Sequence, residues 1–146
     1  MGRAQEADPG GLSGRGPTVI FVDSNIFIYA VGRSHPLREE AQRFFLETSE
    51  AGKRLVTSAE VLQELLHVYL PLGRTETLDA ALELATKGVD QVIPVDRETV
   101  LLARALVDKY PGLTARDLVH LAVCRMHKIP ELMTFDRTLR AAFNKG

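Results

Sequence analysis

Two short apolar runs in this sequence each end in an aspartate, a pattern that places carboxylates where a ligand could bind. The run Thr18–Val22 is followed by Asp23, and the run Leu132–Phe135 is followed by Asp136. Short runs of this composition are typical of strands buried on both faces. Because the carboxyl ends of parallel strands open onto a ligand-binding crevice, both aspartates are candidates for a single site.

Two further acids lie on predicted helices. Glu64 falls at the rim of the apolar face of a helix predicted over residues 58–69. Asp117 lies in a helix that is apolar nearly all round, where an unpaired carboxylate is costly to bury. Asp117 therefore needs a partner.

Carboxylates that converge on one crevice indicate a bound cation. Two of them about 4 Å apart repel by about 4 kcal/mol at an effective dielectric constant of 20. The single cysteine, Cys124, provides neither a disulfide framework nor a cysteine-based zinc site. An oxygen-only ligand set favours Mg²⁺ or Mn²⁺, and Mg²⁺ is commonly shared between carboxylates and substrate phosphates.

The elements that must position these acids follow from hydrophobic periodicity and from turn residues. The predicted strands are Thr18–Val22, a brief run at Leu55–Val56 that ends in Thr57 and Ser58, Val92–Val95, and the run before Asp136. Pro94 puts the third strand near a sheet edge. The predicted helices are Asn25–Val31, Leu37–Ala51, a helix to Tyr69 opened by a Thr57/Glu60 capping box, Thr75–Lys87, a helix capped by Asp96 and reaching Tyr110, Thr114–His127 and Thr138–Phe143. Alternating strands and helices predict an α/β fold with a parallel sheet covered on both faces.

Composition fits one globular domain. The chain has 146 residues, 45% hydrophobic and 25% charged, with a net charge of -1 that neither supports nor excludes RNA as a partner. Residues 1–17 are rich in Gly and Pro and are expected to form a loose tail before a domain over residues 18–146. No stretch is apolar enough for a membrane span, and the lone cysteine fits a cytoplasmic setting.

Each acid also has a purely structural interpretation. Asp23, Asp96 and Asp136 each precede a predicted helix and could act only as N-caps. Asp117 stands three residues after Thr114, at capping-box spacing. Glu64 could be a solvated residue at the rim of its helix face. Whether these acids are only structural or form a catalytic site therefore depends on how they are arranged in space.

Four motifs together resemble a known family. They occur in the order and at the approximate spacing of the PIN-domain ribonucleases, especially the VapC-like toxins of prokaryotic toxin–antitoxin pairs: Val22–Asn25 (VDSN), Val61–Leu66 (VLQELL), Ala115–Ala122 (ARDLVHLA) and Thr134–Asp136 (TFD). The resemblance covers nearly everything from Thr18 onward. It implies a three-layer α/β/α fold around a parallel sheet of four to five short strands.

The resemblance also implies a metal-dependent endoribonuclease and a role for individual residues. One or two Mg²⁺ or Mn²⁺ ions would be held by an acidic quartet: Asp23, Glu64, Asp117 and Asp136. Asn25 and Thr134 match auxiliary polar positions that would orient the carboxylates or a metal-bound water. In such a site the ions lower the pKa of a water, align it with the phosphodiester and stabilise the leaving oxygen.

The basic residues near the quartet, and Asp96, are not assigned as metal ligands. Arg116 and Arg137 each adjoin a quartet acid and are candidates for phosphate contacts, although each could equally be an exposed helix-end arginine. His120 lies one turn after Asp117 on a predicted polar stripe, and it stays outside the catalytic set because a metal-activated water needs no separate base. The family has no metal ligand at Asp96, which is read as a cap.

The expected partners and the competing functions follow from the same resemblance. An RNA substrate, a small antitoxin that inserts a basic side chain near the acids, and a homodimer are all implied. A receiver-type phosphoacceptor domain is disfavoured because the required lysine on a later strand is missing. A non-catalytic RNA-binding or scaffold domain, and a housekeeping RNA-processing nuclease, remain as alternatives.

Overall fold

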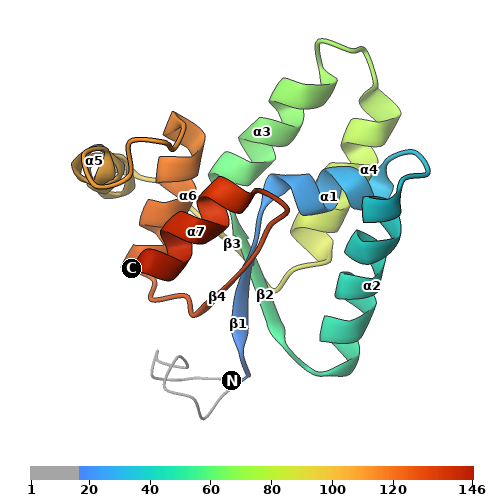
Figure 1. Ribbon diagram of the computed structural model, residues 1–146. Helices are drawn as coiled ribbons and strands as arrows, with labels where there is room; N and C mark the ends of the chain where they lie inside the picture. The colour runs from blue at the N-terminus through green and yellow to red at the C-terminus, as the bar shows by residue number, and fades with distance from the viewer. Residues whose placement is uncertain (1–16) are drawn as a thin grey trace.

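A four-stranded parallel sheet forms the centre of the molecule (Figure 1). The structure is a computed structural model that describes residues 17–146, so the tail expected over residues 1–17 lies outside the described residues except for Pro17. The strands, in the order β3-β2-β1-β4, are β1 (Val19–Val22), β2 (Arg54–Ser58), β3 (Gln91–Ile93) and β4 (Glu131–Met133). Since all three pairings are parallel, the four carboxyl ends share one edge of the sheet.

Helices cover both faces of the sheet and complete the three-layer α/β/α architecture (Figure 1). One group of mutually packed helices contains α1 (Ser24–Val31), α2 (Pro36–Glu50), α3 (Ala59–Tyr69) and α4 (Thr75–Lys87). The other contains α5 (Arg97–Leu106), α6 (Ala115–Met126) and α7 (Arg137–Lys145). Helix α3 also contacts α6, which brings the two groups together beside the sheet. Within residues 17–146, no helix combines the length and the apolar character needed to cross a membrane.

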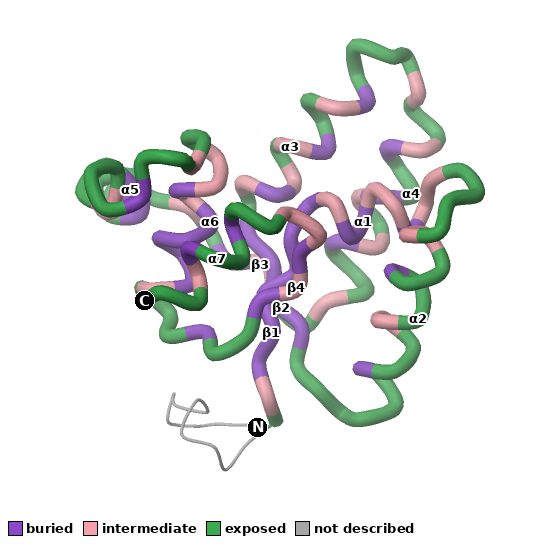
Figure 2. Tube along the Cα trace, in the orientation of Figure 1, coloured by how far each residue is buried: buried purple, intermediate pink, exposed green. Residues whose placement is uncertain are grey.

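The core is built on the two central strands, which are buried along most of their length (Figure 2). Phe21 of β1 and Phe27 of α1 are fully buried in the main cluster, which also takes in apolar residues of α3 and α4. A smaller cluster joins α5, α6 and α7 through residues such as Leu121 and Tyr110. Burial of both faces of β1 explains why its sequence is continuously apolar and does not alternate.

Most predicted elements are confirmed, and the differences are local. Helix α4 has the predicted bounds, and β3, which precedes Pro94, is an edge strand as expected. The helix predicted to reach Tyr110 ends at Leu106.

The Thr57/Glu60 capping box is wrong. Ser58 is the N-cap of α3, and its hydroxyl accepts from the Val61 N–H at 3.4 Å. Strand β2 continues through Ser58, and the Thr57 hydroxyl instead donates to the Val22 carbonyl oxygen of the neighbouring strand at 2.8 Å. The extra strand residue shifts the helix start by one position and frees Glu60 from a capping role.

Candidate metal centre

Asp23 lies at the carboxyl end of β1 and is fixed from several sides. It is the N-cap of α1, and its Oδ1 accepts from the Ser24 N–H at 2.7 Å. Its Oδ2 accepts from the Thr134 hydroxyl at 2.7 Å. The residue is only 4% exposed, so its charge is held in a confined setting at the edge where the strands end. Asp23 is therefore a helix N-cap, as its purely structural interpretation predicted. It is also a member of a larger polar cluster.

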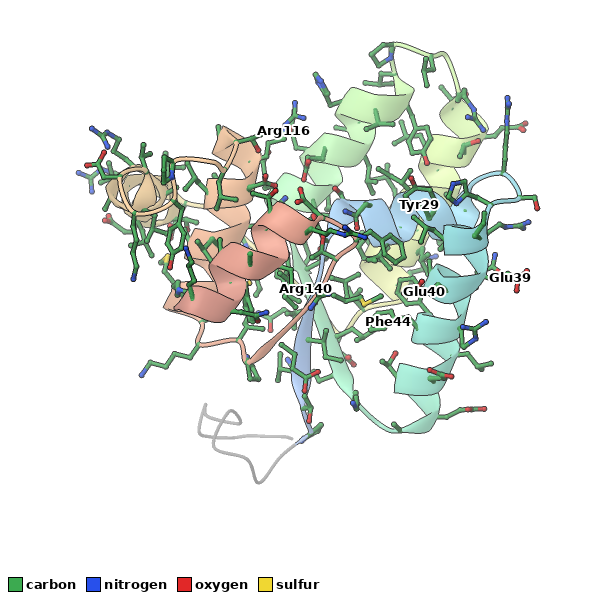
Figure 3. All side chains as sticks on the ribbon, in the orientation of Figure 1. Tyr29, Glu39, Glu40, Phe44, Arg116 and Arg140 are labelled. Carbon is green, nitrogen blue, oxygen red and sulfur yellow. The ribbon has the colours of Figure 1, made fainter. Side chains whose placement is uncertain are left out.

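Thr134 links the ends of the neighbouring strands β1 and β4. Its hydroxyl accepts from the Asn25 side-chain amide at 3.2 Å and from the Asp136 N–H at 3.0 Å, while it donates to Asp23. The Asn25 carbonyl oxygen accepts from the Phe135 N–H at 3.2 Å, and the Arg140 side chain, labelled in Figure 3, donates to the Thr134 carbonyl oxygen at 3.0 Å. These contacts hold the start of α1 against the segment after β4, so Asp23 and Asp136 keep a fixed relation.

Glu64 of α3 reaches the same edge through His120 of α6. The His120 Nε2 lies 2.6 Å from Glu64 Oε1 and 3.5 Å from Asp23 Oδ1. One ligand atom from each of these three residues lies within 4.8 Å of the others, the one such His, Cys, Asp or Glu cluster found in residues 17–146. Elements distant in the sequence therefore bring two of the four predicted acids together, with an imidazole between them.

The environment of His120 corrects the predicted polar stripe. The residue is 1% exposed, with its ring 5.7 Å from that of Phe21, so it faces the core and not solvent. Burial lowers the pKa of His120, but the hydrogen bond to Glu64 and the charges of Asp23, Glu64 and Asp117 outweigh it, and the pKa is raised. The imidazole therefore supplies positive charge or an N–H donor to the carboxylates beside it.

Asp117 and Asp136 lie outside the group formed by Asp23, Glu64 and His120, but Asp117 is close enough to be affected by the charges of Asp23 and Asp136. Burial raises the pKa of Asp117, the Thr114 hydroxyl lowers it, and the charges of Asp136 and Asp23 raise it further. Asp136 is the N-cap of α7, and its Oδ1 accepts from the N–H groups of Thr138 and Leu139 at 2.9 and 3.1 Å. Its Oδ2 accepts no hydrogen bond from residues 17–146 and is available to a ligand.

Glu60 is an acid of the cluster that the sequence interpretation did not include. Burial raises the pKa of Glu60, the charge of His120 lowers it, and the charge of Glu64, one turn further along α3, raises it. Arg116 Nε lies 3.9 Å from Glu60 Oε2, and Figure 3 shows Arg116 at the start of α6, toward α3. Arg116 is therefore engaged with an acid, whereas Arg137 is exposed and has no carboxylate within 4.0 Å in the described residues.

The residues present fit a divalent cation. Burial and the charge of Glu64 raise the pKa of Glu60, and burial and the charges of Asp136 and Asp23 raise the pKa of Asp117, so negative charge accumulates here. The donors are carboxylate oxygens, the ligands that Mg²⁺ and Mn²⁺ prefer. The fit for His120 as a ligand is poor. A metal-bound imidazole normally donates its other N–H, and the buried His120 Nδ1 has no partner in residues 17–146.

We expect His120→Leu to destabilise the metal-free protein, because Asp23 and Glu64 lose their shared buried partner. The expected decrease in the free energy of unfolding is about 3 kcal/mol, the usual cost of leaving a buried charge without its partner. Mn²⁺ should restore most of the loss, since a cation offsets the same carboxylates. Denaturant unfolding in EDTA and in Mn²⁺ measures both effects, with His120→Gln as the control that keeps an N–H donor. A loss that Mn²⁺ does not reduce would contradict this role.

Both missed residues carried a partial signal in the sequence. His120 stands three residues after Asp117, so the two lie on neighbouring faces of a helix that is otherwise apolar. Glu60 stands four residues before Glu64, which places both on one face of α3. The assumed capping box assigned Glu60 elsewhere, and the metal-water mechanism gave no reason to include His120.

Comparison with known proteins agrees with this geometry. The model of the PIN domain family matches residues 20–143. Ribonuclease VapC23 of Mycobacterium tuberculosis is 50% identical over 125 residues, which are 86% of this chain and 98% of the relative. Ribonuclease VapC13 of the same organism is 45% identical over 119 residues, which are 82% and 91% of the two chains.

Solved structures share the fold. The crystal structure of Mycobacterium tuberculosis VapC20, described as a Sarcin-Ricin loop cleaving toxin, superposes with a TM-score of 0.71 at 22% identity over 84% of this chain and 94% of that one. VapBC2 from Rickettsia felis, bound to a DNA fragment from its promoter, gives a TM-score of 0.55 at 14% identity over 82% and 100%. With the family match and the 50% identical relative, these findings show that the chain belongs to the PIN domain family, among the VapC ribonucleases.

Proposed function

We propose that this protein is a metal-dependent endoribonuclease that hydrolyses RNA phosphodiester bonds at the carboxyl edge of its sheet, with Mg²⁺ or Mn²⁺ as the ion. The observation that carries the proposal is the meeting of Asp23 and Glu64, from separate elements, around the buried His120. The names of the relatives, all ribonucleases, support the reaction class. The donor chemistry supports the choice of a hard divalent ion.

The acidic quartet of Asp23, Glu64, Asp117 and Asp136 would hold the ion. A bound divalent ion supplies a water of lowered pKa and compensates charge on the phosphate and the leaving oxygen. Asp23 is oriented for this task by Ser24 and Thr134. Asn25 and Thr134 act as positioning residues, because their hydrogen bonds fix Asp23 relative to the segment that carries Asp136.

His120 acts as a positioning residue that keeps Glu64 and Asp23 in place before the ion binds. Its Nε2 faces both carboxylates, whose mutual repulsion would otherwise drive their side chains apart. Asp23 and Glu64 would be compensated in the same way by a bound divalent ion. The site is therefore organised in advance, which reduces the cost of ordering its ligands on binding.

Positive charge near the quartet has to attract the phosphate. Arg137 follows Asp136 directly, is exposed and has no ion-pair partner among residues 17–146, so it suits a phosphate contact. Arg116 is held by Glu60 and is better suited to restraining that acid. Of the two arginines proposed from sequence, the geometry favours Arg137.

The protein is further proposed to be the toxin of a toxin–antitoxin pair and to form a homodimer in the cytoplasm. The VapBC2 structure, whose title names a VapBC pair, supports a small antitoxin partner. Light scattering after size-exclusion chromatography tests the dimer. A single species at the chain mass of 16.1 kDa would exclude it.

Two alternatives use the same fold. A non-catalytic RNA-binding or scaffold domain would tolerate loss of a quartet acid, yet all four acids are present and linked by contacts or by charge. A housekeeping RNA-processing nuclease would share the metal site and would differ in having no antitoxin. Co-purification with the product of an adjacent short reading frame separates the latter from a toxin.

Removal of the metal provides the direct test of the reaction. Incubation with total RNA should give discrete cuts in Mg²⁺ or Mn²⁺ and none in EDTA, and added Mg²⁺ should restore cleavage. Mapping of the cut ends then identifies the target RNA. Cleavage that persists in EDTA would refute a metal-dependent mechanism, and intact RNA under every metal condition would favour the scaffold alternative.

A further inference from the structure

A pocket lies between the segment that joins α5 to α6 and helix α7. Its volume is about 400 Å³, and apolar side chains such as Leu113 and Ala142 form part of its lining. Lys109, Arg137 and Lys145 also line it. The pocket therefore combines an apolar interior with cationic side chains, although the chain as a whole carries a net charge of -1.

The three cations are free to bind an anion. Lys109, Arg137 and Lys145 are exposed, and none has a carboxylate within 4.0 Å in the part of the chain that the structure describes. Lys109 Nζ lies 5.5 Å from the centre of the Tyr110 ring, which holds this lysine beside the pocket. Such clustering of unpaired cations on one face is the electrostatic pattern of a site for a polyanion.

The pocket adjoins the quartet on two sides. Thr138 lines the pocket, and its backbone N–H donates to Asp136 Oδ1 at 2.9 Å. Leu113, on the other side, immediately precedes Thr114, which caps the helix that carries Asp117. A chain of nucleotides that leaves the metal centre past these two helix starts would therefore enter the pocket.

We infer that this pocket is a subsite for the RNA substrate, in which a base of a nucleotide flanking the cleaved bond contacts the apolar lining while Lys109 and Lys145 bind its phosphates. The inference rests on the proposed ribonuclease function and adds the place where the substrate is held. A single-stranded substrate fits best, because an unpaired base can leave the stack and enter a pocket. The surrounding cations also offset the repulsion between RNA and the quartet.

The first test removes the charges that lie away from the quartet. A double variant, Lys109→Gln with Lys145→Gln, is compared with Lys53→Gln plus Lys87→Gln, which makes the same change in net charge at exposed positions of the chain before β2 and β3. Binding of a fluorescently labelled single-stranded oligoribonucleotide is measured by anisotropy in EDTA over a range of KCl concentrations. Two lost phosphate contacts should lower the slope of log affinity against log salt by about 1.4. The control should keep the wild-type slope.

The second test fills the pocket. Gly112 lines it, and an added Cβ would lie in ordinary contact, 3.9 Å from the Cγ2 of Thr138, which also lines the pocket. We therefore expect a leucine side chain at this position to occupy part of the pocket. Gly112→Leu should weaken RNA binding about 10-fold, the size of one lost base contact. Ala80→Leu, on the exposed surface of α4, is the control for added bulk.

The outcomes separate this inference from the proposed function. The subsite is refuted if both the lysine double variant and Gly112→Leu bind RNA with the wild-type affinity and with the wild-type slope of log affinity against log salt. This holds whether or not the protein cleaves RNA. Wild-type protein without salt-dependent RNA binding would overturn it as well. If these variants bind RNA more weakly but the wild-type protein cleaves no RNA in Mg²⁺ or Mn²⁺, the subsite is supported and the ribonuclease function is refuted.

Discussion

Asp117→Asn is expected to abolish metal-dependent RNA cleavage while raising the melting temperature of the metal-free protein. The carboxylate is partly buried, and burial together with the charges of Asp136 and Asp23 raises its pKa. A raised pKa in the folded state means that the charged form destabilises the fold at pH values above that pKa, so removing the charge stabilises the protein. In the proposed mechanism the same charge helps to hold the ion, so its loss should lower cleavage more than about 100-fold.

Asp96→Asn is the matched control for this prediction. Asp96 also precedes a helix, and its Oδ1 accepts from the Thr99 N–H and hydroxyl at 3.1 and 2.9 Å in a capping box. These hydrogen bonds lower the pKa of Asp96, the opposite of the shift at Asp117, so loss of its charge should destabilise the fold. Cleavage should remain at the wild-type rate. Equal losses of cleavage in the two variants would show that Asp117 is only a structural acid.

Asp23→Asn is expected to abolish cleavage as completely, for a different structural reason. Asp23 contacts Ser24, Thr134 and His120, and an amide can replace only some of these hydrogen-bond acceptors. The amide keeps one acceptor oxygen for the Ser24 N–H but offers a nitrogen to the Thr134 hydroxyl. We expect a loss of more than about 100-fold in cleavage, as for removal of a metal ligand.

Thermal melting distinguishes loss of the site from loss of the fold. Removing the Asp23 charge relieves its repulsion with the Glu64 carboxylate but weakens its contacts with His120 and Thr134, so these effects offset one another and the melting temperature should change little. Circular dichroism melts in EDTA measure this alongside the cleavage assay. Cleavage within about 10-fold of wild type, with metal binding preserved, would remove Asp23 from the set of ligands.

The sequence was informative wherever one residue pattern determined one local structure. The continuous apolar run before Asp23 identified the buried strand β1, and the acids after this run and after the run Leu132–Phe135 marked the sheet edge at which Asp23 and Asp136 lie. The Pro94 signal for an edge strand was confirmed because proline cannot donate to a sheet ladder. These inferences depend only on residues that are close together in the sequence. The parallel topology follows from the alternation of strands and helices.

Contacts between distant elements could not be read in the same way. The place of His120 depends on α3 and α6 meeting beside the sheet, and helical periodicity alone left it on a polar stripe. Glu60 was misassigned because a one-residue extension of β2 moved the cap from Thr57 to Ser58. The pocket beside α7 is formed by two segments about thirty residues apart, and no spacing in the sequence indicates that they enclose a space.

The central claim is that acids from four separate elements hold one divalent metal centre. The most direct measurement is the anomalous scattering of Mn²⁺ in crystals of the wild-type protein soaked with that ion. We predict a peak at the carboxyl edge of the sheet in contact with Asp23 and with carboxylate oxygens of at least two of Glu64, Asp117 and Asp136. A peak only at other residues, or none at saturating Mn²⁺, would contradict it.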